Sequence, residues 1–308
     1  MRILVYGAGP LGSFFASKLY ESGLDVSILA RGRRLSDIRE HGIVLERFDT
    51  EQRTVTRVLL VESLDTEDAY NLIMVIMGKN HIPSVLPTLA SNRATPNILF
   101  MGNSAAGPSE LAEALGCERV LLGFPKLSGA IHGHVVRYLT WKRPGLSLGE
   151  LDGKMSQRIV WLKEMFEGAG FRVDVSSNMD AWLKYHAAII LPFAGAYVRA
   201  GRSLKALSKD KQGIALMFKA MRDGFRVLKK LGFPVTPGSL KIFEWLPLWI
   251  LVPLMQRILK MKRMEYAFAH GDAARNEMKV LAEEFREIIR SSSVQTPAYD
   301  ELSQYVYP

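Results

Sequence analysis

Short apolar runs alternate with helix-like segments along the first part of the chain. Four runs are typical of buried strands: residues 2–6, 25–30, 70–77 and 97–102. The segments that follow the first, third and fourth of these runs have helical character: residues 10–23, 81–90 and 109–116. Strands that alternate with helices in this order favour a parallel sheet with helices on both faces.

The pattern changes after Gly123. The next predicted elements are irregular or antiparallel strands, one helix and a last strand, in residues 133–153, 155–170 and 171–176. From about Ser177 onward the periodicity is almost wholly helical. We therefore expect a boundary near residue 175 that divides the chain into domains of residues 1–175 and 176–308.

A glycine cluster separates the first predicted strand from the first helix and reads G-x-G-x-x-G. Here the first glycine permits a tight turn, the second lets the backbone approach a pyrophosphate, and the third lets helix and strand pack closely. We expect the loop to bind a dinucleotide through Gly7, Ala8, Gly9, Pro10, Leu11 and Gly12. The predicted fold class is therefore α/β, with an N-terminal Rossmann-type dinucleotide-binding domain and a C-terminal all-helical domain.

The end of the second predicted strand indicates which dinucleotide is bound. Proteins that bind NAD usually have Asp or Glu there, which bonds the ribose hydroxyls. This chain has Arg31, Arg33 and Arg34 and no acid. Guanidinium groups pair with a 2′-phosphate, whereas a carboxylate repels it. We expect the cofactor to be NADP(H), with Arg31 as the best-placed contact.

One lysine lies in an otherwise apolar helical segment. Between Ala181 and Val198 the titratable side chains other than tyrosines are Lys184 and His186. Such a lysine snorkels, pairs with a carboxylate or lines a polar cleft. Asp180, four residues earlier, could hold it at the surface. The pattern leaves a catalytic and a structural role equally open, and it favours a packing role for the histidine.

The net charge of +9 is uneven, because residues 199–263 carry most of the basic excess. Solvated helix faces are the plain interpretation, and no nucleic-acid-binding motif accompanies them. The single cysteine, Cys117, excludes an internal disulfide and suits a reducing compartment, so we expect a cytoplasmic protein. His132 and His134 have no cysteine or acid cluster around them and predict no metal site.

The most apolar stretch is WLPLWILVPLM, residues 245–255. It contains two prolines and is shorter than the roughly 20 residues that a membrane span requires. We expect no integral membrane segment, and a buried helix and turn at this stretch. An apolar lid and a membrane-facing patch are the alternatives.

Several motifs follow one another along the chain: RILVYGAGPLGSFFASKL, ILARG, VIMGK, LFMGNSAAG, AWLK and MEYAFAHG. In this order they resemble the ketopantoate reductase family, the 2-dehydropantoate 2-reductases and their relatives, over essentially the whole chain. The resemblance implies that Lys79 and Asn103 lie at the cofactor. It also implies that Lys184 is the catalytic lysine and that Glu265 binds or orients the substrate hydroxyl.

The activity that the resemblance implies is hydride transfer from NADPH to a 2-keto acid, with the lysine donating a proton to the developing alkoxide. Reduction of 2-dehydropantoate to pantoate in pantothenate biosynthesis is one candidate. The substrate is then a small keto acid or ketone, and the helical domain could support a homodimer.

The substrate-binding part of the family pattern departs from this sequence. Ala188 stands where the family has an asparagine, Pro192 comes one residue early, and Ser104 replaces a glycine. The family's substrate-binding serine falls near Pro253. A site built to hydrogen-bond a hydroxy acid discriminates less when these partners become apolar. We therefore expect a different substrate, such as a bulkier or more apolar ketone.

Two other classes of function remain as alternatives. One is an NADP(H)-binding sensor or regulatory protein without catalysis, which the missing asparagines favour. The other places the basic, apolar C-terminal region on a membrane surface, with a lipid-like substrate. Retention of Lys184 and Glu265 favours the reductase over the sensor.

Overall fold

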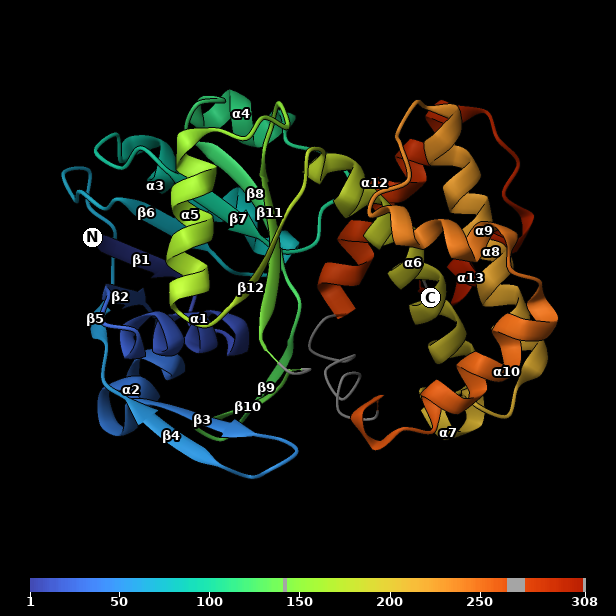
Figure 1. The fold of residues 1–308 in the computed structure, drawn as a ribbon, viewed down its shortest axis with the longest axis horizontal. Coiled ribbons are helices and arrows are strands. Elements are labelled where there is room, and N and C mark those ends of the chain that lie inside the picture. The colour runs from blue at the N-terminus through green and yellow to red at the C-terminus, as the bar shows by residue number, and fades with distance from the viewer. Residues whose placement is uncertain (141–142, 265–274, 307–308) are drawn as a thin grey trace. The chain divides into compact units, whose positions relative to one another are not determined.

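The computed structural model describes residues 1–140, 143–264 and 275–306 (Figure 1). The chain forms two compact units. The first, which we call the sheet unit, comprises residues 1–102 and 108–179. The second, the helical unit, comprises residues 103–107 and 180–308. The assignment of separate cofactor and substrate roles to residues 1–175 and 176–308 stays a prediction.

The sheet unit contains all the described strands. They are β1 (Arg2–Tyr6), β2 (Asp25–Leu29), β3 (Ile43–Arg47), β4 (Arg53–Thr56), β5 (Leu59–Val61), β6 (Leu72–Val75), β7 (Ile98–Met101), β8 (Val120–Pro125), β9 (Ser128–His132), β10 (Val135–Leu139), β11 (Gly145–Glu150) and β12 (Arg172–Val175). Its helices are α1 (Pro10–Glu21), α2 (Gly32–His41), η1 (Lys79–His81), α3 (Ile82–Ser91), α4 (Ser109–Leu115) and α5 (Gln157–Gly168).

The main sheet has eight strands in the order β12-β11-β8-β7-β6-β1-β2-β5. All neighbouring pairs are parallel except β8 with β11. The chain builds outward from β1 through β2 to β5, and then crosses to β6 on the other side of β1. This reversal creates a topological switch point between β1 and β6, where open α/β sheets bind their ligands. The predicted Rossmann-type sheet is confirmed.

A second sheet of four strands, in the order β4-β3-β10-β9, was not predicted as such. The sequence indicated irregular or antiparallel strands only beyond residue 133, and it missed β3, β4, β5, β8 and β9. β3, β4 and β5 are short, and their polar and apolar residues do not alternate as in a long half-buried strand, whereas β8 is a nearly continuous buried run of six residues. Strand pairing between distant segments, such as β3 with β10, decides their formation.

Helix α1 is fixed between the two sheets by aromatic packing. The Phe14 ring lies 4.7 Å from that of Tyr138 on β10, and the Phe15 ring stacks at 4.9 Å on Phe171, which leads into β12. Both phenylalanines are fully buried. Because α1 begins at the glycine loop, this packing holds the loop against the end of β1.

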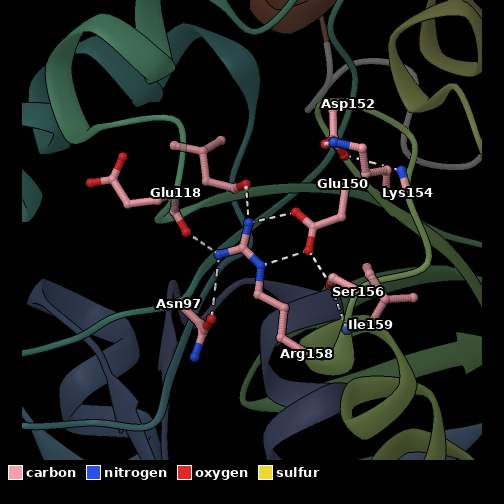
Figure 2. A network of polar contacts seen from close by, with 9 residues as sticks. Asn97, Glu118, Glu150, Asp152, Lys154, Ser156, Arg158 and Ile159 are labelled. Atoms are coloured by element: carbon pink, nitrogen blue, oxygen red, sulfur yellow. Dashed lines mark hydrogen bonds and ion pairs between the residues drawn. The ribbon is translucent and has the colours of Figure 1, made fainter.

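A partly buried ion pair between Arg158 and Glu150 connects α5 to the sheet (Figure 2). The guanidinium of Arg158 donates to both carboxylate oxygens of Glu150, to the carbonyl oxygens of Glu118 and Val120, and to Asn97. Burial opposes ionisation of Glu150, but the hydrogen bonds from Arg158 and Ser156 outweigh it and hold its pKa below the ordinary value. The network therefore joins α5, β11 and the segments that lead into β7 and β8.

The helical unit consists of helices around an aromatic and aliphatic core, in agreement with the prediction. Its described helices are α6 (Met179–Arg199), α7 (Leu204–Leu207), α8 (Lys211–Lys230), η2 (Gly238–Lys241), α9 (Ile242–Trp245), α10 (Leu248–Leu259), α12 (Arg275–Ser292) and α13 (Pro297–Val306). Helix α8 packs against α10, α12 and α13. The buried carboxylate of Asp223 on α8 accepts hydrogen bonds from the backbone N–H groups of Ala298 and Tyr299, and so caps α13.

The prediction of a buried helix and turn at residues 245–255 is wrong in part. The helix α10 forms, but Trp245 is 69% exposed and Trp249 is 76% exposed. Apolar residues on a helix do not reveal which of them face the core when both faces are apolar. No single described helix has the length and apolarity of a membrane span. The two helical parts at residues 238–245 and 248–259 have this length and apolarity only when they are counted together. They are bent by 118° relative to each other.

Candidate functional site

The glycine loop lies at the carboxyl end of β1, beside the switch point. Gly7 has a φ of +123°, and a Cβ at this position would lie 2.3 Å from the carbonyl oxygen of Ile76. A Cβ on Gly12 would lie 1.8 Å from the carbonyl oxygen of Gly7. These two glycines are required by the close approach of β1, β6 and α1. At Gly9, by contrast, a Cβ would meet no atom of the described residues within 4 Å, so this backbone is open to a ligand on their side.

The start of α1 offers donors on the same side. Gly9 is its N-cap and Pro10 its first residue, and no side chain of the part of the chain that the structure describes caps the helix. The first N–H groups of an uncapped helix attract anions, and phosphates above all. Together with the open approach at Gly9 and the switch point, the loop from Gly7 to Gly12 fits the pyrophosphate of a dinucleotide. Ala8 is buried, and the side chain of Leu11 is half-buried.

The arginines after β2 divide into two kinds. Arg31 is exposed at the N-cap of α2, and its guanidinium donates to the Tyr6 hydroxyl at 3.3 Å. Arg34 points back to the loop, where it donates to the Ala8 carbonyl at 3.0 Å and to the Ser13 hydroxyl at 3.2 Å. Arg34 therefore braces the glycine loop, which the sequence did not indicate. Arg31 and the exposed Arg33 are the cations available to a ligand phosphate.

Lys79 lies at the neighbouring strand end. It is the first residue of η1, after the residues that follow β6, and only 8% of it is exposed. Because β1 and β6 are parallel neighbours, their carboxyl ends meet at one edge of the sheet. The structure thus places Lys79 at the same edge as the glycine loop, as a cofactor role requires.

Lys184 is buried in the helical unit. It lies on α6, is 5% exposed, and pairs with Asp180 one turn earlier. Its ammonium lies 4.8 Å from the centre of the Phe233 ring. The backbone of Gly107 is also close, because a Cβ there would lie 3.2 Å from the Lys184 Nζ. The carboxylate and the ring face compensate the burial of the charge. The predicted i,i+4 pair forms, but it does not hold the lysine at the surface.

Asn103 begins the short segment that joins the helical unit after β7. Its amide donates to the Glu277 carboxylate at 3.0 Å, and its side-chain oxygen is buried with no hydrogen-bond partner among the described residues. The backbone N–H groups of Ala105 and Ala106 donate to one carboxylate oxygen of Glu284. Two acids seven residues apart on α12 therefore anchor this segment. Their heptad spacing was visible in the sequence, but their partner was not.

Other residues singled out from the sequence have different outcomes. Glu265 lies outside the described residues. Ala188 is fully buried and packs against Gly224 of α8, where an added Cβ would lie 3.0 Å from the alanine Cβ. This close packing of α6 on α8 leaves little room for an asparagine. Pro253 is exposed on α10. His186 is half-buried and stacks on Trp182 at 5.5 Å, and burial of its ring lowers its pKa to about 4.

One family model matches part of this sequence. Residues 3–152 match the model of the family described as "Ketopantoate reductase PanE/ApbA". A curated relative, the 2-dehydropantoate 2-reductase of Mesorhizobium japonicum, is 25% identical over 263 residues, which cover 76% of this chain and 78% of that protein. An uncharacterised oxidoreductase of Bacillus subtilis, YkpB, is 24% identical over 242 residues, covering 77% and 78%.

Solved structures share the fold over the full length. The 2-dehydropantoate 2-reductase of Geobacter metallireducens has a TM-score of 0.80 at 19% identity, with 99% of each chain covered. A D-mandelate dehydrogenase in a ternary complex with NADH and anilino(oxo)acetate has a TM-score of 0.81 at 16% identity, covering 100% of this chain and 97% of that one. At these identities the likeness concerns the fold alone.

Proposed function

We propose that this chain is a divergent member of the ketopantoate reductase PanE/ApbA family, whose model residues 3–152 match, and that it reduces a 2-keto acid or a related ketone with NADPH. The family consists of oxidoreductases that act on a keto or hydroxyl group with a nicotinamide dinucleotide. The observation that carries the proposal for this chain is the buried ammonium of Lys184. A buried lysine beside one carboxylate and an aromatic ring is a prepared proton donor.

The cofactor side of the proposal rests on the sheet unit. The pyrophosphate binds along Gly7 to Gly12 and the start of α1, while Arg31 receives the 2′-phosphate of NADP(H). Lys79 lies at the next strand end, and Asn103 orients the nicotinamide side of the cofactor. The bound cofactor supplies the hydride, which goes to the carbonyl carbon of the substrate.

The proton goes to the carbonyl oxygen. Lys184 donates it from Nζ, so that the C=O group becomes CH–OH as the oxygen gains negative charge. Asp180 and Phe233 hold the ammonium in place and limit its movement. Glu265 binds or orients the hydroxyl that forms.

The substrate-binding positions differ from the family pattern. The position of the family asparagine is occupied by Ala188, which the packing against Gly224 fills. A site without this hydrogen-bond partner discriminates less in favour of a hydroxy acid. Ketopantoate stays one candidate. We favour a bulkier or more apolar 2-keto acid, and phenylglyoxylate is a suitable aromatic test compound.

The test follows oxidation of NADPH by its absorbance with ketopantoate, phenylglyoxylate and a panel of aliphatic 2-keto acids and ketones. Lys184→Ala should lower kcat by about 1,000-fold with the best substrate and leave NADPH binding unchanged. Lys219→Ala, at an exposed position of α8, is the matched control and should keep full activity.

Two results would contradict the proposal. Tight NADPH binding with no turnover of any carbonyl compound would favour the sensor. Turnover that Lys184→Ala does not change would remove the lysine from the mechanism. Rapid turnover of ketopantoate would retain the reductase and reject the redirected substrate.

A further inference from the structure

Exposed apolar side chains gather on one part of the helical unit. Ile242, Trp245, Trp249, Leu254 and Met261 are exposed by 41%, 69%, 76%, 49% and 44%. We call these residues the α9–α10 surface. The other large exposed apolar residues of the described chain occur singly or in twos at distant parts of the sequence, which is ordinary for a protein surface. A group of exposed apolar side chains within twenty residues, as on this surface, indicates an interaction site.

The α9–α10 surface is presented by helices that are firmly attached to α8. Arg222 donates to the carbonyl oxygens of Phe243 and Leu246, which fixes the turn between α9 and α10. Lys229 pairs with Glu244 at 3.0 Å. In addition, the inward residues of α10 are buried: Leu251, Val252 and Leu259. The exposed tryptophans are therefore the outer face of a well-packed element, and not the result of a poorly packed one.

Basic side chains surround the apolar ones. Lys241, Arg257, Lys260 and Lys262 are exposed, and none of them forms an ion pair with another residue in the described ranges. The one acid of this stretch, Glu244, is already paired. Residues 241–262 therefore combine exposed tryptophan and leucine with positive side chains that form no ion pair within the described residues.

We propose that the α9–α10 surface binds an anionic lipid bilayer from the aqueous side. Tryptophan combines an apolar ring with an N–H donor and prefers the membrane–water boundary. Lysine and arginine beside it are attracted to anionic headgroups. The bend of 118° between the two helical parts rules out a straight span, and it suits a pair that lies in the boundary with Trp245 and Trp249 inserted.

The same charges disfavour a second copy of the chain as the occupant. Two-fold symmetric dimers bring the same surface of each copy together. Such contact through this surface would place the basic side chains of both copies, Arg257 and Lys260 among them, close to one another. Like charges opposed across an interface destabilise it. An anionic bilayer neutralises these charges and also accepts the apolar side chains.

The test is co-sedimentation of the full chain with vesicles of phosphatidylcholine alone and of phosphatidylcholine with phosphatidylglycerol. We expect binding to the anionic vesicles that falls as salt is raised. The double variant W245S/W249S should weaken this binding at least about tenfold, because both rings lose their insertion. The triple variant R257Q/K260Q/K262Q should weaken it about 100-fold.

Controls separate lipid binding from folding and from catalysis. V55S/L59S removes two apolar side chains of the sheet unit, each 59% exposed, and should bind as the parent does. Far-ultraviolet circular dichroism and NADPH binding should be the same for all variants. The readout is lipid binding, so its result is independent of any turnover.

Two outcomes would overturn the proposal. One is the absence of binding to anionic vesicles at low salt. The other is a concentration-dependent dimer in sedimentation velocity that W245S/W249S abolishes, without any vesicle binding by the parent. That result would assign the α9–α10 surface to a second copy.

Discussion

The two units position their candidate groups by different means. In the sheet unit the backbone performs this task, because Gly7 and Gly12 allow β1, β6 and α1 to approach within distances that no side chain permits. In the helical unit, side chains position the candidate group, because Asp180 and Phe233 hold the buried ammonium of Lys184 beside the apolar helix α6. A backbone site depends on a few small residues, whereas a side-chain site depends on complementary charges. The two units should therefore respond to substitution in different ways.

The largest expected effect tests the backbone site. Gly12→Ala would place a Cβ 1.8 Å from the Gly7 carbonyl oxygen, so we expect the free energy of unfolding to fall by about 4 kcal/mol. Gly9→Ala is the matched variant, since its Cβ would meet nothing within 4 Å. It should change stability by less than about 0.5 kcal/mol and weaken cofactor binding. Urea unfolding measures the stability of the two variants, and NADPH titration measures their cofactor binding. Equal stability of the two variants would contradict the assignment.

The next prediction concerns acid. Burial lowers the pKa of His186 to about 4 from 6.5, so the unfolded chain binds a proton that the folded chain excludes. The helical unit therefore loses stability as pH falls from 6.5 to about 4, by up to about 3 kcal/mol. In the sheet unit, burial opposes the ionisation of Glu46, but Arg53 and Arg137 outweigh it and lower its pKa. The ionised carboxylate of Glu46 therefore stabilises the fold at pH values above 4.5, the ordinary pKa of a glutamate. This contribution is lost only as the pH falls below 4.5.

Urea unfolding across this pH range checks the difference. The variant His186→Phe keeps an aromatic ring against Trp182 and has no proton to bind. Its stability should stay level between pH 6.5 and 4.5, where that of the parent declines. A parallel decline in both proteins would show that other groups cause the loss.

The third prediction compares two i,i+4 ion pairs. Asp180→Asn removes the charge that holds the buried Lys184, so kcat should fall about 100-fold with little change in KM. As a positioning residue, Asp180 should also shift the basic limb of the pH profile of kcat, which a purely structural loss would not move. Glu167→Gln breaks the exposed pair with Lys163 on α5 and should alter neither property. An unchanged pH profile in Asp180→Asn would contradict the role of this carboxylate.

Sequence patterns predicted the parts of the site that depend on neighbouring residues. The glycine loop, the strand before it and the helix after it lie within twenty residues, and the predicted strand–loop–helix formed there. The brace from Arg34 to Ala8 and the anchoring of Asn103 by Glu277 were missed. The second contact joins residues 174 positions apart, so only the three-dimensional fold reveals it.

The exposed tryptophans were missed for a related reason. Apolarity at residues 245–255 predicted burial, since burial is the usual fate of such residues. However, α10 is apolar on both sides, and among the described residues its inner side, with Leu251 and Val252, is buried, whereas Trp249 and Leu254 are exposed. The packing of α8 against this helix selects the buried side, and the sequence of α10 alone does not contain that choice.

The smallest expected effect concerns the choice of cofactor in the sheet unit. Arg31 is exposed and forms one long hydrogen bond to Tyr6 and another to the Glu62 carbonyl oxygen, so it is available to a phosphate. Arg31→Ala should raise the KM for NADPH about tenfold and leave that for NADH unchanged, because only NADPH carries the 2′-phosphate. Arg39→Ala, on the same helix but paired with Glu62 at 2.6 Å, is the matched control. If the parent prefers NADH, or if Arg31→Ala raises both KM values equally, the guanidinium does not read the phosphate, and cofactor selection in the sheet unit would not rest on this side chain.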